Sequence, residues 1–227
     1  MKYSIRVNEV KNNDGNLRAF ATVVFGDCFK ITNIAILSDK ESGSFFISMP
    51  RYRTNECNKN GVIYKDVCNP ITKEFRDELY GNILATYENL QKQDQKQEHG
   101  GQSVHTEPKF TVSVTTYEKE GSNIRGIARI YFEDSFIVNN VNILQGKDNL
   151  FVAMPSYKSK QTDVQGKSVY QEVCYPVTKE FREKLYEKII SIYEWEIQKI
   201  KNKKNNHVTV QLAPRTESYH KPSSGRR

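Results

Sequence analysis

A segment near the middle of the chain occurs again near its end, and this repetition is the strongest constraint on the fold. "CNPITKEFRDELYGNILATYE" spans residues 68–88, and "CYPVTKEFREKLYEKIISIYE" spans residues 174–194. Upstream, "NLRAFATVVFGDCFKITNIAIL" at 16–37 aligns with "NIRGIARIYFEDSFIVNNVNIL" at 123–144. Matches of this length in a fixed order predict two copies of one structural unit rather than one large domain.

Each copy begins with a pattern typical of an antiparallel sheet. Apolar residues alternate with others at 17–25 and at 124–132, which predicts strands with one buried face. Turn residues separate these segments from their neighbours, so we expect three antiparallel strands and then a short fourth one that stops at Pro50 or Pro155. A polar loop and one last, shorter extended segment should follow.

Each copy ends with a pattern typical of an amphipathic helix. Thr72 and Thr178 precede Lys-Glu, and their hydroxyls can cap the free amides of a first helical turn. Large apolar residues then recur every four positions, which puts one stripe against the sheet. These residues are Phe75, Leu79, Ile83, Tyr87, Phe181, Leu185, Ile189 and Tyr193.

The sequence therefore predicts an α+β fold built from two similar units. Unit 1 should span residues 1–90 and unit 2 residues 109–200. Residues 91–108 are rich in Gln, Lys and Glu with a Gly pair, which indicates a flexible linker. Residues 201–227 are expected to form a basic, disordered tail.

The net charge of +7 lies almost entirely at the C-terminal end. Residues 1–90 carry 12 Lys and Arg against 11 Asp and Glu, and residues 109–194 carry the same numbers. Residues 195–227 carry 8 against 2. A basic binding face on either unit must therefore come from local clustering of charges rather than from an overall excess.

The remaining composition argues against several classes of protein. The four cysteines lack metal-ligand spacing and are expected to be reduced thiols, so no metal and no cofactor is predicted. All four histidines fall in the predicted linker or tail, and we find no catalytic constellation, so an enzyme is not expected. No stretch is long and apolar enough to span a membrane, and no signal peptide is recognised at the start. We expect a soluble, cytoplasmic protein that does not bind membranes.

The order of these elements resembles the SpoVG family, the stage V sporulation protein G regulators of bacteria. The resemblance rests on "LFVAMPSYKSK" in unit 2 and "FFISMPRYRTN" in unit 1, each followed by an extended step, a proline and a Thr-Lys-Glu helix start. It implies small α+β units that dimerise through their sheets and bind DNA, and in some members RNA, to regulate genes. Here the second unit could supply the partner in cis, and further self-association of the chain stays open.

The resemblance also implies where nucleic acid would bind. It places basic side chains in the loop after Met-Pro and at the helix start, namely Arg51, Arg53, Lys158, Lys160, Lys73, Arg76, Lys179 and Arg182. Ordinary solvated surface charges explain these residues nearly as well. Two departures are visible, because Asn69 and Tyr175 stand where the family has His, and Arg51 replaces a small residue.

The C-terminal lysines offer a second, sequence-independent way to neutralise phosphates. Lys201, Lys203 and Lys204 are the predicted contacts, although a solvated helix end and a disordered terminus explain them almost as well. Our functional expectation is a nucleic-acid-binding regulator of the SpoVG type. The alternative is a module that pairs with another protein through its sheet and does not touch nucleic acid.

Overall fold

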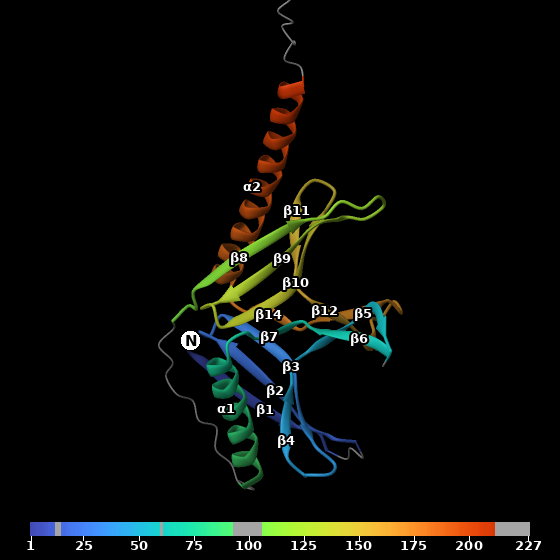
Figure 1. Cartoon of the computed structure of the whole chain (residues 1–227). Helices are drawn as coiled ribbons and strands as arrows, with labels where there is room; N and C mark the ends of the chain where they lie inside the picture. Colours follow the sequence, from blue (N-terminus) through green and yellow to red (C-terminus); the bar gives the residue numbers. More distant parts are fainter. Residues whose placement is uncertain (12–14, 60, 93–105, 212–227) are drawn as a thin grey trace, which may run out of the picture.

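The computed structural model describes residues 1–11, 15–59, 61–92 and 106–211, and it contains two units of the same architecture (Figure 1). Unit 1 consists of β1 (Tyr3–Glu9), β2 (Leu17–Phe25), β3 (Phe29–Ser38), β4 (Phe45–Ser48), β5 (Arg51–Asn58), β6 (Gly61–Asp66), β7 (Cys68–Pro70) and α1 (Lys73–Lys92). Unit 2 consists of β8 (Phe110–Thr116), β9 (Ile124–Phe132), β10 (Phe136–Gln145), β11 (Leu150–Ala153), β12 (Ser156–Thr162), β13 (Ser168–Glu172), β14 (Cys174–Pro176) and α2 (Lys179–Gln211). The predicted α+β fold with two units is confirmed.

Each unit forms an antiparallel sheet with one face covered by its own helix. β1, β2, β3 and β4 are neighbours in the first sheet, and β8, β9, β10 and β11 in the second. Along β2, Ala19, Ala21, Val23 and Phe25 are fully buried, while the residues between them reach the opposite face. Period-two alternation therefore has the predicted consequence, a helix-covered inner face and an open outer face.

The two sheets are joined because each unit gives one short strand to the other. β7 of unit 1 pairs with β10, and β14 of unit 2 pairs with β3, both antiparallel. Hydrogen bonds continue beyond these strands, since the Thr32 amide donates to the Val173 carbonyl at 2.8 Å and the Asn139 amide donates to the Val67 carbonyl at 2.7 Å. The units are thus interlocked rather than merely in contact.

A bulge in each central strand prepares it for the exchanged strand. In β3, the register against β2 shifts between the pairs that contain Ile31 and Ile34. Asn33 has φ 60° and its counterpart Asn140 has φ 56°, a left-handed conformation that Asn tolerates better than most residues. The extra residues direct the amides beside them toward the incoming chain.

One hydrophobic core runs through both units. Phe25 and Phe136 pack edge to face with ring centroids 5.0 Å apart, and Phe29 and Phe132 lie 4.7 Å apart. All four rings are fully buried and belong to a single cluster that also includes the stripes of both helices. Burying aromatic rings across the junction supplies much of the driving force that holds the units together.

Both helices start as predicted, at a threonine cap. The Phe75 amide donates to the Thr72 hydroxyl, and the Phe181 amide donates to the Thr178 hydroxyl, both at 3.3 Å. The tail was expected to begin at residue 201, but α2 continues to Gln211. The last part of this helix projects beyond its sheet (Figure 1). Residues 212–227 and 93–105, within the expected tail and linker, lie outside the described residues.

Candidate nucleic-acid interface

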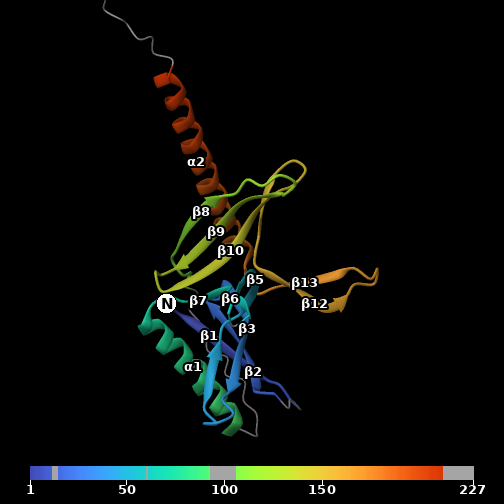
Figure 2. The same ribbon diagram turned by 45° about the vertical axis from the view of Figure 1, so that its right-hand side comes forward.

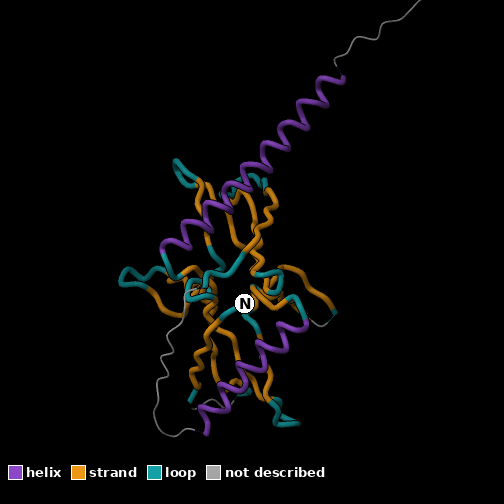
Figure 3. The backbone as a smooth tube through the Cα atoms, turned by 90° about the vertical axis from the view of Figure 1, so that its left-hand side faces the viewer, coloured by secondary structure: helices purple, strands orange, loops and turns teal. Residues whose placement is uncertain are grey.

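The segment after each Met-Pro, expected to be a polar loop, is the first strand of a hairpin. β5 pairs with β6, and β12 pairs with β13, each as a separate two-stranded sheet. Both hairpins leave the waist of the molecule on the side away from the helices (Figures 1 and 2), and their tips diverge to either side in the view of Figure 3. The prediction of a loop was wrong. In β5, Tyr52 and Thr54 alternate with Arg51 and Arg53, and the first two are partly buried, which is typical of a strand with one partly covered face. β12 has a similar start, Ser-Tyr-Lys-Ser.

Arg51 stands at the base of the first hairpin and is held in place by an acid. Its Nε donates to Oδ1 of Asp66 at 2.9 Å, directly across the strand pair. This bond uses one of the five donors of the guanidinium. Because the Arg51 side chain is 57% exposed, an anion can reach the other donors. Arg53, two residues further on the same face of β5, is exposed as well.

The second hairpin carries its basic residues differently. Lys158 corresponds to Arg53 and is exposed, whereas Ser156 stands where unit 1 has Arg51. Ser156 lies opposite Glu172, the counterpart of Asp66. Lys160 lies within β12, but its side chain is outside the described residues. The two hairpins are therefore alike in backbone and unlike in charge at their base.

The arginines at the helix starts have a structural contact. An Nη of Arg182 donates to the Pro176 carbonyl at 3.1 Å, and an Nη of Arg76 donates to the Pro70 carbonyl at 3.5 Å. Each carbonyl belongs to the last residue of the exchanged strand, so each arginine ties its helix to that strand. Lys179 pairs with Glu183 at 3.7 Å, and Lys73 is exposed. These contacts explain the helix-start arginines without any ligand.

Two of the predicted residues act on the same partly buried phenol, that of Tyr80. Burial raises the pKa of Tyr80, while the positive charges of Arg76 and Arg51 lower it. One hairpin residue and one helix-start residue of unit 1 therefore both lie within electrostatic reach of Tyr80. In unit 2, burial also raises the pKa of Tyr186, and among the basic residues Arg182 acts on it.

The C-terminal lysines lie far from the hairpins, on the projecting part of α2. Lys201 and Lys203 are exposed, and the side chain of Lys204 is outside the described residues. On the same helix, Trp195 is 58% exposed, and the Lys199 ammonium lies 4.5 Å from its ring centroid. This part of the helix is a separate basic surface rather than an extension of the waist.

Sequence reasoning missed a groove of about 570 Å³ at the waist. It lies between the outer face of the first sheet and the base of the second hairpin, and we call it the waist groove. Its lining includes Phe20, Ala35, Met49, Arg51 and Tyr157. The exposed position of Phe20 in an alternating strand was a visible signal, but the approach of Tyr157 from the other unit was not.

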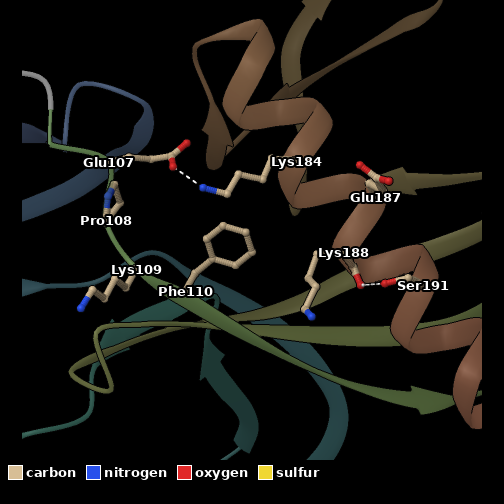
Figure 4. Close-up of a pocket in the computed structure, with 8 residues that line it drawn as sticks. All are labelled: Glu107, Pro108, Lys109, Phe110, Lys184, Glu187, Lys188 and Ser191. Carbon is tan, nitrogen blue, oxygen red and sulfur yellow. Dashed lines mark hydrogen bonds and ion pairs between the residues drawn. The ribbon is translucent and has the colours of Figure 1, made fainter.

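A second hollow, of about 560 Å³, lies between the start of β8 and α2 (Figure 4). Phe110 forms its apolar wall, and Lys184 turns toward Glu107, with which it forms an ion pair. In unit 1 the corresponding place carries hydrogen bonds between β1 and α1, because the Tyr3 hydroxyl donates to Glu78 and accepts from Asn82, both at 2.8 Å. Glu107 and Glu187 offset only part of the charge of Lys109, Lys184 and Lys188, which line the same hollow.

Other kinds of site receive no support from the described residues. Cys28, Cys57, Cys68 and Cys174 are free thiols, and no group of metal-ligating side chains gathers within the described ranges. Cys174 is buried next to Cys68, and that burial raises the pKa of its thiol. Among the described helices, none is long and apolar enough to cross a membrane.

The fold and the waist define the class of protein: an internally duplicated α+β module whose copies exchange a strand and carry basic hairpins. The family model described as SpoVG matches residues 1–89 and 109–195, which together make up well over half of the chain. The chain belongs to the SpoVG family, with two tandem copies of the family unit.

Individual relatives agree with this assignment. The protein of Treponema denticola named "Putative septation protein SpoVG" is 32% identical over 74 residues, which cover 33% of this chain and 73% of the relative. The protein of the same name from Phytoplasma australiense is 36% identical over 73 residues, 32% of this chain and 70% of the relative. That from Lachnospira eligens is 31% identical over 83 residues, 37% and 86% respectively. Each alignment is about as long as one unit, so the predicted resemblance is confirmed.

Proposed function

We propose that this chain is a nucleic-acid-binding regulatory protein of the SpoVG type, and that it grips phosphates with the two waist hairpins. The observation that carries the proposal is the exposure of Arg51, Arg53 and Lys158 on two arms that leave the same side of one rigid core. The guanidinium fork matches the oxygens of a phosphate, and an ammonium adds a point charge, so basic side chains on such arms favour phosphate contacts.

The projecting part of α2 supplies a second, looser contact in this proposal. Lys201 and Lys203 face solvent on a helix that extends away from the waist. Long-range attraction between such lysines and a polyanion is sensitive to salt and insensitive to sequence. The hairpins would give the organised mode of binding, and the C-terminal segment would add affinity to it.

The test compares three variants by fluorescence anisotropy with labelled DNA and RNA over a range of salt concentrations. Changing Arg51, Arg53, Lys158 and Lys160 to Ala should lower the affinity by about 100-fold at low salt and reduce the salt slope by about one for each lost phosphate contact. Deleting residues 201–227 should lower the slope while leaving binding detectable. The matched control changes four exposed lysines in turns at the far ends of the sheets, Lys11, Lys40, Lys119 and Lys147, to Ala.

The control removes the same net charge, so it should reproduce only the general electrostatic loss. If the hairpin variant binds like this control, the hairpins are not the interface. If the wild-type chain binds neither DNA nor RNA at low salt, the proposal fails and the role of a protein-pairing module takes its place.

A further inference from the structure

We infer that the waist groove receives an unpaired nucleobase, so that the chain prefers single-stranded nucleic acid to a duplex. This inference rests on the proposed function and adds to it the form of nucleic acid that is bound. It comes from side chains that the phosphate-binding proposal does not use, namely the aromatic rings beside Arg51.

The groove has the size and lining of a small-ligand site. Its volume of about 570 Å³ falls within the range of about 300–1,000 Å³ that ligand pockets usually occupy. Ala35 and Met49 contribute apolar lining, and two aromatic rings stay accessible, with Phe20 37% exposed and Tyr157 40% exposed. Exposed rings in a concave, partly apolar place are available to stack on a planar aromatic ligand.

The charge beside these rings indicates which aromatic ligand fits. Arg51 lines the same groove, and its bond to Asp66 fixes the guanidinium at the groove wall while most of its donors stay free. A base is followed by a phosphate at a fixed covalent distance along a nucleic acid strand. Stacking surface and phosphate donor side by side therefore match a nucleotide better than an uncharged aromatic compound or an apolar peptide.

The groove exists because the two units exchange strands. Tyr157 comes from unit 2, and it reaches the sheet of unit 1 because β14 pairs with β3 and the Val173 carbonyl accepts from both the amide and the hydroxyl of Thr32. The Tyr157 hydroxyl donates to Oε1 of Gln171 across the hairpin, which restricts how the ring can turn. A restricted ring loses less entropy when a base stacks on it.

The corresponding positions of unit 2 carry different chemistry. Ile127 stands in place of Phe20, Asn142 in place of Ala35 and Ser156 in place of Arg51, while Tyr52 of unit 1 corresponds to Tyr157. The second position thus lacks one ring, part of the apolar lining and the guanidinium. We expect the groove in unit 1 to dominate base binding, which makes the duplicated chain functionally asymmetric.

A stacked duplex cannot fill this groove, because its bases are covered on both faces. The experiment measures the affinity of the full chain for a single-stranded oligonucleotide, for a duplex of the same length and for polyphosphate as a competitor without bases. Wild-type chain should bind the single strand more tightly than the duplex. Tyr157→Ala should weaken single-strand binding about tenfold, the loss expected for one base stack, with an unchanged salt slope and unchanged duplex affinity.

Three further variants keep the test decisive. Tyr157→Phe retains the ring and should bind within about threefold of wild type. Phe20→Ile gives the groove the residue of unit 2 and should weaken binding severalfold without disturbing the strand. Tyr52→Ala, the matched change in the other hairpin, should have a smaller effect than Tyr157→Ala. Circular dichroism and thermal melting check that each variant is folded.

The outcomes separate this inference from the function on which it rests. If the chain binds nucleic acid but Tyr157→Ala and Phe20→Ile leave single-strand affinity unchanged, the inference is overturned and phosphate gripping by the hairpins stands. Equal affinity for duplex and single strand overturns it as well. If the wild-type chain binds no nucleic acid, both the inference and the proposed function fail.

Discussion

The two units share their interior and differ at their surface. Phe25 of unit 1 corresponds to Phe132 of unit 2, and both are fully buried in the common core. At the hairpin base, however, the Arg51–Asp66 pair of unit 1 corresponds to Ser156 and Glu172 in unit 2. Close packing allows little change at interior positions, whereas a surface position can change charge at small cost in stability.

This difference indicates a division of labour within one chain. The exchanged strands and the shared rings need two matching units, because each sheet is completed by the other. The proposed binding needs only one surface of suitable chemistry, and at the waist groove unit 1 provides Arg51 and Phe20 while unit 2 provides Tyr157. A tethered pair can therefore keep the architecture of a symmetric dimer while its two faces diverge, which a dimer of identical chains cannot do.

The largest expected effect tests whether the common core makes the two units one cooperative structure. Phe25→Ala and Phe132→Ala should each lower the free energy of unfolding by about 3–5 kcal/mol, because each removes a fully buried ring at the junction. Both variants should still unfold in a single transition, measured by urea titration with far- and near-ultraviolet circular dichroism. Phe46→Ala, at an exposed position, should change the stability by about 0.5 kcal/mol or less.

Separate behaviour of the units would contradict this view. Two transitions, of which Phe25→Ala moves only one and Phe132→Ala only the other, would show that the units fold independently. The exchanged strands would then contribute little to stability.

A smaller effect is expected where the helices hold the exchanged strands. Arg182→Ala and Arg76→Ala each remove a bond to a proline carbonyl and should destabilise the chain by about 1 kcal/mol. The loss should be larger for Arg182, whose bond is 3.1 Å against 3.5 Å for Arg76. Lys73→Ala removes a charge from the same helix turn as Arg76 without removing this bond, so it should have little effect on thermal unfolding. Equal melting temperatures for all three variants would refute the tether.

The smallest effect is expected on stability at alkaline pH, where Tyr3 of unit 1 should differ from its counterpart in unit 2, Phe110. Burial, opposed by the Asn82 hydrogen bond and reinforced by Glu78, raises the pKa of Tyr3 from its ordinary value of 10.0 to about 12. A raised pKa stabilises the folded chain fully below pH 10, and this contribution is lost as the pH rises toward 12. Tyr3→Phe gives unit 1 the residue of unit 2, so it should make stability less sensitive to pH in this window. Identical pH profiles for wild type and Tyr3→Phe, measured by thermal melting, would show that the Tyr3 phenol does not titrate in this way.

Much of the architecture could be predicted from the sequence because it depends on near neighbours along the chain. Alternation over 17–25 placed the buried faces of the strands, and Thr72 and Thr178 marked the helix starts where the structure has them. The apolar stripe at every fourth residue identified the helix face that packs on the sheet. These patterns repeat within a few residues, so the secondary structure of each segment can be predicted from that segment alone.

The exchange of strands was decided by the tertiary structure. β7 and β14 have only three residues each, Cys-Asn-Pro and Cys-Tyr-Pro, which is too short for a periodicity that could name a partner. Each could have paired within its own unit, since β3 and β10 have similar edges. The crossed pairing is accompanied by the packing of four phenylalanine rings at the junction and by backbone hydrogen bonds between the units. The waist groove depends on that crossing, because it sets Tyr157 beside Phe20 and Arg51. Local sequence thus determined the secondary structure, and contacts between residues far apart in the sequence, such as those between β14 and β3, determined which surfaces these elements form together.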